Sequence, residues 1–120
     1  LEQVAPVLEG VSEEQMQQII IGFEPTFAIG TGMSASTKGA EDVAEQIRKT
    51  VRKLYGSDVA DSTRILYGGS VNRDNLKSLI KQKDIDGVLV GKAIMKSLTN
   101  SCCRVLAFTT QQAFSLVSSY

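Results

Sequence analysis

The sequence contains no histidine and no tryptophan, only two cysteines, and no excess of either charge. Without an imidazole, neither acid–base chemistry nor metal binding can depend on histidine. The cysteines, Cys102 and Cys103, are adjacent, and two thiols without spacing or a histidine partner do not form a zinc site. We therefore expect no bound metal, and reduced thiols as in a cytoplasmic protein.

The charge balance excludes further classes of protein. Lys+Arg and Asp+Glu each number 13, so the net charge is zero. Proteins that bind nucleic acid or membrane surfaces through bulk charge carry a basic excess, and we expect neither partner. No hydrophobic run reaches the length of a membrane span, and the first residues show no signal-peptide pattern. The chain does not begin with Met, so we expect a piece of a longer protein in the cytoplasm.

The periodicity of apolar residues predicts alternating strands and helices. Short apolar stretches predict strands at 17–23, 64–67 and 86–90. The clearest helix is 40–54, whose charged residues we expect on a solvated face. Its expected buried face consists of Val43, Ala44, Ile47, Val51 and Leu54. Further helices are expected at 1–9, at 12–15, from 71 onward and at 94–98.

This alternation predicts an α/β fold with a parallel sheet. The spacing of the strands is typical of a (β/α)₈ barrel, of which these would be three βα units. Three strands cannot close a barrel, so the edges of the sheet would be exposed.

A single carboxylate, Glu24, stands where the first predicted strand ends. The carboxyl end of a strand faces the ligand crevice in α/β proteins, so Glu24 is a candidate catalytic residue. Pro25 restricts Glu24 to extended geometry and so defines the position of the carboxylate. On spacing alone, an ordinary loop with a solvated Glu explains the pattern equally well.

All three predicted strands are followed by glycine. The loops contain Gly30 and Gly32, then Gly68-Gly69-Ser70, then Gly91. Glycine-rich loops after the last strands of (β/α)₈ enzymes bind phosphate through backbone amides. Three such loops beside a rigid Glu indicate a phosphorylated small substrate and a carboxylate base.

These motifs resemble the triosephosphate isomerase family. The stretch from Glu24 to Gly32, the Tyr67-Gly68-Gly69-Ser70-Val71 motif and the stretch from Asp86 to Gly91 match in order and separation. The resemblance covers residues 10 to about 95. It implies a partial (β/α)₈ TIM barrel formed by the last three βα units, and interconversion of dihydroxyacetone phosphate and glyceraldehyde 3-phosphate without a cofactor.

The resemblance also assigns roles to residues. It implies that Glu24 is the catalytic base and that residues 25–35 form a lid over the triose phosphate. The substrate phosphate would be bound by Gly30, Ser70, Gly91 and Lys92. The latch of the closed lid would be Tyr67, Gly32 and Ala35. The family forms homodimers, and we expect the main interface in the N-terminal part of the barrel.

The sequence departs from the family in several places. Phe27 stands where Trp is common, and Lys92 stands where a second Gly is common. The family's catalytic His, Lys and Asn belong to earlier strands, for which we find no matching segment. We therefore expect residues 1–96 to be the C-terminal part of a TIM-barrel domain, inactive alone, followed by a divergent tail at 97–120. The alternatives are another phosphate-binding barrel enzyme and a non-catalytic fragment that binds phosphate or a partner.

Overall fold

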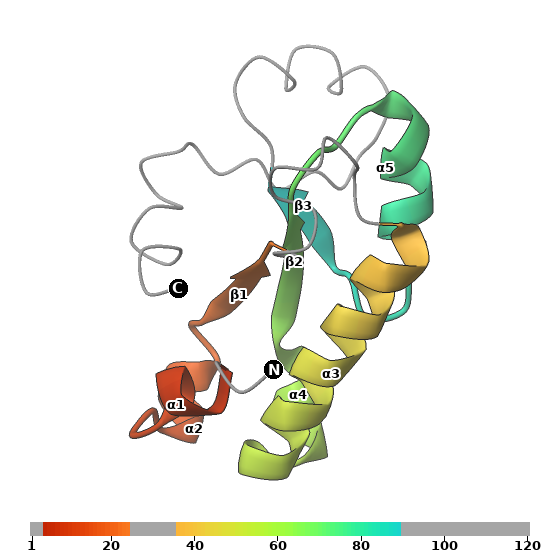
Figure 1. Cartoon of the computed structure of the whole chain (residues 1–120). Coiled ribbons are helices and arrows are strands. Elements are labelled where there is room, and N and C mark those ends of the chain that lie inside the picture. The colour runs from red at the N-terminus through yellow and green to blue at the C-terminus, as the bar shows by residue number, and fades with distance from the viewer. Residues whose placement is uncertain (1–3, 25–35, 90–120) are drawn as a thin grey trace.

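A computed structural model of the chain describes residues 4–24 and 36–89. Within these ranges a three-stranded sheet in the order β1-β2-β3 is packed against helices (Figure 1). The strands are β1 (Ile20–Phe23), β2 (Arg64–Gly68) and β3 (Gly87–Leu89). The helices are α1 (Val4–Leu8), α2 (Glu13–Met16), α3 (Thr37–Tyr55), α4 (Ser57–Ser62) and α5 (Arg73–Ile80).

Both strand pairs are parallel, which confirms the expected α/β architecture. Phe23 pairs with Tyr67, and Tyr67 pairs with Val88 on its other side. The carboxyl ends of the three strands therefore meet at one edge of the sheet. Among the described residues, β1 and β3 each have β2 as their only neighbouring strand.

The first strand begins later than predicted because a capping box holds the preceding helix. The backbone N–H of Gln15 donates to Ser12 Oγ at 3.2 Å, and that of Ser12 donates to Gln15 Oε1 at 2.9 Å. This box confirms the predicted helical turn. Its helix ends at Met16 and is followed by a turn, so β1 starts at Ile20 rather than at residue 17.

One face of the sheet forms the core together with α3 and α5. Ile21, Ile65, Tyr67 and Val88 are buried on this face. The helices supply the buried residues Ala40, Ala44, Ile47, Val51, Leu76 and Leu79. Figure 1 shows α3 and α5 on the same side of the sheet.

On the opposite face of the sheet, leucine side chains lie over glycine positions of other strands. Leu66 is buried but does not belong to the helix-covered core. A Cβ on Gly87 would lie 2.9 Å from Leu66 Cδ2, and one on Gly22 would lie 3.0 Å from Leu89 Cδ1. Such distances are too short for carbon atoms in contact. Glycine at both positions leaves room for Leu66 over β3 and for Leu89 over β1, and a larger residue there would require these flexible side-chain ends to shift.

The long helix α3 corrects two details of the sequence prediction. It begins at Thr37 rather than near residue 40, because Ser36 Oγ accepts a hydrogen bond from the backbone N–H of Gly39 at 3.0 Å. Ala44, Ile47 and Val51 are buried as expected, but Leu54 is 49% exposed. Leu54 lies in the last turn of the helix, where the neighbouring Tyr55 packs against the core instead.

The charged residues of α3 do not all lie on a solvated face. Glu45 and Lys49 form the expected exposed pair, with Oε1 and Nζ 2.9 Å apart. Arg48 is only 7% exposed, so the prediction was wrong for this residue. It occupies a position between Ala44 and Val51 on the buried face of the helix.

The break at Gly56 is present, but the sequence prediction missed the helix that follows. Gly56 has a positive φ of 90°, which terminates α3. Helix α4 begins at the next residue and packs on α3 with Ala60 fully buried. The last helix predicted, at 94–98, lies outside the described residues.

The second capping box stabilises the start of α5, as predicted for Asn72. Its Oδ1 accepts hydrogen bonds from the N–H groups of Asp74 and Asn75, both at 2.9 Å, and Asn75 Oδ1 accepts from the N–H of Asn72 at 2.8 Å. Val71 and Leu76 on either side of the cap are buried, as in a hydrophobic staple.

We expect Asn72→Ala to lower the free energy of unfolding by about 1 kcal/mol, because the first amides of α5 lose their acceptor. Urea denaturation of the variant and the parent chain measures this difference. Asn72→Asp is the matched control, since a carboxylate oxygen still accepts both bonds. An equal loss in the two variants would contradict a capping role.

None of the helices in the described part of the chain is long and apolar enough to cross a membrane.

Candidate active site

Three of the predicted site residues lie in the described part of the chain, at the carboxyl edge of the sheet. They are Glu24, Tyr67 and Ser70. The other predicted site residues lie outside the described residues, namely Gly30, Gly32, Ala35, Gly91 and Lys92. Their roles stay predictions.

Glu24 directly follows the last residue of β1 and is exposed. Because Phe23 pairs with Tyr67, the carboxylate follows β1 at the level where β2 enters its glycine turn. The parallel register thus brings two segments more than 40 residues apart to the same edge.

Tyr67 connects these two segments. Its ring packs edge-on against Phe23, with centroids 5.8 Å apart and ring planes at 76°. It is 1% exposed. Burial raises the pKa of the Tyr67 hydroxyl, and the negative charge of Glu24 raises it further. A phenol is protonated at neutral pH even at its ordinary pKa of 10.0, and this shift only reinforces that state, so its O–H can donate a hydrogen bond at this edge.

The turn after β2 fits closely around the Tyr67 side chain. Gly69 has a φ of 155°, and a Cβ at this position would lie 2.7 Å from the Tyr67 hydroxyl oxygen. Both the backbone conformation and the contact require glycine. Ser70 follows this turn and is exposed to solvent.

We expect Gly69→Ala to lower the free energy of unfolding by about 1–3 kcal/mol, because it combines backbone strain with a steric clash. Gly10→Ala is the control. Gly10 also has a positive φ, of 81°, but nothing lies within 4 Å of a Cβ there. The difference between the two variants in urea denaturation isolates the contact with Tyr67. Equal losses would show that the Tyr67 hydroxyl does not restrict this turn.

The first amides of α5 are occupied by the capping box. Asp74 and Asn75 donate to Asn72, and the Asn75 side-chain amide donates to the backbone oxygen of Ser70 at 2.8 Å. An anion at this edge would therefore be bound by the turn at 68–70 rather than by the N-terminus of α5. The hydrogen bond from the Asn75 side chain to the Ser70 oxygen also holds the turn against α5.

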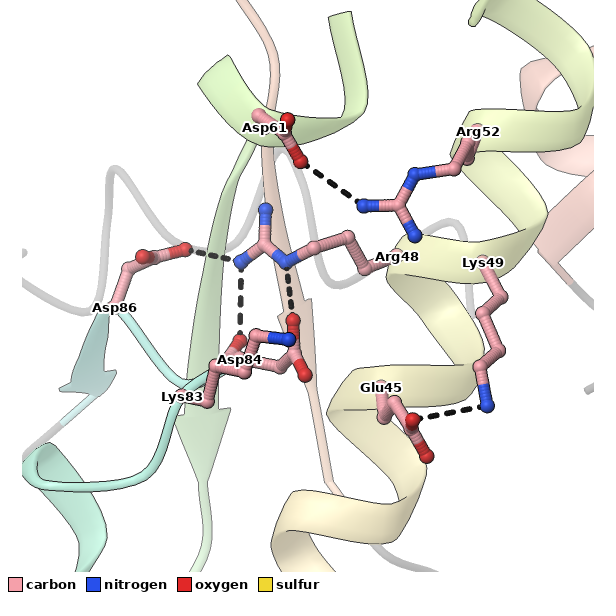
Figure 2. Close-up of a pocket in the computed structure, with 8 residues that line it drawn as sticks. All are labelled: Glu45, Arg48, Lys49, Arg52, Asp61, Lys83, Asp84 and Asp86. Carbon is pink, nitrogen blue, oxygen red and sulfur yellow. Dashed lines mark hydrogen bonds and ion pairs between the residues drawn. The ribbon is translucent and has the colours of Figure 1, made fainter. Parts of the chain in front are cut away.

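Between α3 and the sheet, Arg48 forms a network that the sequence prediction missed (Figure 2). Its Nε donates to Asp84 Oδ1 at 2.6 Å, and its Nη2 donates to Asp86 Oδ2 at 2.8 Å. Its Nη1 donates to the backbone oxygens of Ala60 and Thr63, at 2.6 and 2.9 Å. One guanidinium thus connects α3 with the end of α4 and with the segment that enters β3.

Asp86 extends this network into the sheet. Its Oδ2 accepts a hydrogen bond from the backbone N–H of Ile65 at 2.8 Å, and its own N–H donates to the Ile65 oxygen at 2.8 Å. These bonds hold the residue before β3 against β2. The network therefore supports the register that brings the strand ends together.

The sequence holds a signal that could have identified this network. Arg48 follows Ala44 by four residues and precedes Val51 by three, so it falls within the apolar stripe of the helix. A charged residue in such a stripe requires a buried partner. Asp84 and Asp86 flank Ile85 just before a predicted strand, which makes them suitable partners.

No group of three or more acidic, histidine or cysteine side chains suited to holding a metal ion occurs in the described ranges.

Comparison with known proteins agrees with the fold and the motifs. The family model described as Triosephosphate isomerase matches residues 1–107. This match extends past residue 96, and the position at which the tail begins stays a prediction.

Curated relatives carry the same description. A triosephosphate isomerase of Borrelia garinii subsp. bavariensis is 47% identical over 97 residues, which cover 81% of this chain and 38% of the relative. That of Roseiflexus sp. is 46% identical over 106 residues, covering 88% and 41%. That of Carboxydothermus hydrogenoformans is 48% identical over 94 residues, covering 78% and 38%. This chain thus spans about two fifths of their length, and it belongs to the triosephosphate isomerase family.

Proposed function

We propose that this chain contributes the catalytic base and part of the phosphate site for the interconversion of dihydroxyacetone phosphate and glyceraldehyde 3-phosphate. The observation that carries the proposal is the parallel register, which brings Glu24 and the turn ending at Ser70 to one edge of the sheet. A carboxylate beside a phosphate-binding turn suits proton transfer on a small phosphorylated substrate.

In this reaction Glu24 removes a proton from the carbon next to the carbonyl and returns it to the neighbouring carbon. The negative charge that develops on the substrate oxygens needs preorganised donors. The Tyr67 hydroxyl is kept protonated beside Glu24, which suits it to hold a closed lid. Gly30, Gly91 and Lys92 would add amides to the phosphate site, and Gly32 and Ala35 would complete the latch.

The proposal also covers the substrate, the cofactor requirement, the oligomeric state and the location of the protein. The substrate is a triose phosphate, and no cofactor is needed because the proton returns to the same molecule. A homodimer belongs to the same proposal because the chain belongs to a family of homodimers. A cytoplasmic location also belongs to it, since a phosphate dianion does not cross a lipid bilayer unaided and the enzyme must share a compartment with its substrate.

Ligand titration of the chain followed by amide resonances tests the phosphate site. We expect 2-phosphoglycolate to shift the Ser70 amide and to slow hydrogen exchange at the Gly30, Ser70 and Gly91 amides. Glycolate, which has no phosphate, is the matched control and should leave all three unchanged. If none of these amides responds to 2-phosphoglycolate at high concentration, the three loops do not form the proposed site.

A further inference from the structure

Asp84 is held by α3 through two residues of opposite charge. Arg48 binds its side chain and also its backbone oxygen, at 2.6 and 3.1 Å. Glu41 accepts the backbone N–H of Asp84 with both carboxylate oxygens, at 3.1 and 3.2 Å. The carboxylates of Glu41 and Asp84 are therefore neighbours, with Asp84 buried and Glu41 partly buried.

We propose that Glu41 and Asp84 form a proton-dependent clamp between the first half of α3 and the segment that enters β3, and that protonation of Glu41 tightens it. Both oxygens of Glu41 accept from the same Asp84 N–H, so a single oxygen suffices to keep that bond. The other oxygen can then carry the proton and donate it to the Asp84 carboxylate. Protonation replaces repulsion between two carboxylates by a hydrogen bond.

Burial and the neighbouring charge both favour protonation of the Glu41 carboxylate. Burial is the largest cause that raises the Glu41 pKa above its ordinary value of 4.5, and the charge of Asp84 and a hydrogen bond to its side chain raise it further. The backbone N–H groups of Asp84 and Lys83 oppose the rise by stabilising the carboxylate.

The other charged groups nearby are directed elsewhere or lie at the surface. On α3, Arg48 is bound to Asp84 and Asp86, and Glu45 is paired with Lys49. The exposed charged residues not yet named are Lys38, Asp42, Arg52 and Lys53 on α3, Asp58 and Asp61 on α4, Arg64 on β2, Arg73, Asp74 and Lys77 on α5, and Lys81 and Lys83 before β3. The neighbouring side-chain charge that raises the Glu41 pKa is that of Asp84.

The effect on stability follows from the raised pKa. Between the ordinary pKa and the raised one, the folded protein binds a proton that the unfolded chain releases, so the free energy of unfolding falls as pH rises through this window. The charged form of Glu41 therefore weakens the clamp at neutral pH. Helix α3 follows the proposed lid and β3 leads to Gly91, so any effect of the clamp on the site rests on the proposed function.

The test compares Glu41→Gln with the parent chain in thermal unfolding at pH 7 and at pH 4. The Gln amide accepts from the Asp84 N–H and donates to the Asp84 side chain at any pH, so it imitates the protonated clamp. We expect the variant to raise Tm by about 2 °C or more at pH 7, with a smaller gain at pH 4. Glu45→Gln is the matched control, one turn along the same helix, and should give no gain at pH 7.

A second measurement needs no variant. In the parent chain the amide resonance of Asp84 should shift with an inflection above pH 4.5, and that of Asp86 should not follow it. A lower Tm for Glu41→Gln at pH 7, or an Asp84 amide that does not respond above pH 4.5, would overturn the clamp. Neither readout involves turnover, so the clamp and the proposed function can fail separately.

Discussion

Replacing Glu24 by Asp should reduce isomerase turnover by about 100-fold, because a carboxylate displaced by about 1 Å no longer reaches the substrate proton correctly. The chain spans 38% of the Carboxydothermus hydrogenoformans relative. The substitution is therefore best assayed in a chimera in which the matching segment of that enzyme is replaced by this chain. The measurement is kcat for triose phosphate, together with KM to separate chemistry from binding.

Glu13→Asp is the matched control, since it makes the same change at an exposed position on α2, away from the strand ends. We expect it to leave kcat unchanged. Glu24→Gln should reduce turnover further than Glu24→Asp, because an amide does not accept the proton. If the chimera is active and Glu24→Gln retains the full rate, Glu24 is not the base, and a phosphate-binding role without catalysis becomes the better description.

Replacing Arg48 by Met should lower the free energy of unfolding by about 3–5 kcal/mol, because it leaves Asp84 buried without its counter-charge. The same change removes the donors to the backbone oxygens of Ala60 and Thr63, which are buried beside it. The Asp84 side chain is 7% exposed, so water cannot replace the guanidinium. Urea denaturation, with Ser70 amide exchange as a second readout, measures the loss.

Arg52→Met is the control for this prediction. Arg52 lies one turn further along α3 and pairs with Asp61 at 2.9 Å, but both side chains are exposed, at 43% and 67%. Exposed pairs of this kind contribute about 0–1 kcal/mol. If both variants lost the same small amount, the Arg48 network would be a surface feature and would not determine the strand register.

Much of the fold could be predicted from short stretches of sequence. The capping boxes at Ser12 and Asn72 depend on residues three positions apart, so the sequence displays them directly. The break at Gly56 is also local, since a positive φ favours glycine. Helix α4 escaped prediction because its six residues are too few to show a period and are held mainly by packing on α3.

The candidate site could be predicted as a set of residues but not as an arrangement. The position of Glu24 at a strand end followed from the apolar run before it. The ring contact between Phe23 and Tyr67 depends on which strands are neighbours. Periodicity along one strand does not contain that information.

By itself, the sequence determined the order of the strands and of the helices other than α4, the caps at Ser12 and Asn72 and the break at Gly56, because each depends on residues within a few positions of one another. Only the tertiary structure decided that Arg48 is buried and that Glu41 faces Asp84. Their partners Asp84 and Asp86 are 36 to 43 residues away. A charge is stable in a protein interior only when folding brings its partner to it. Whether Arg48 is a solvated residue or the centre of a network is therefore decided by the packing of α3 against the segment before β3.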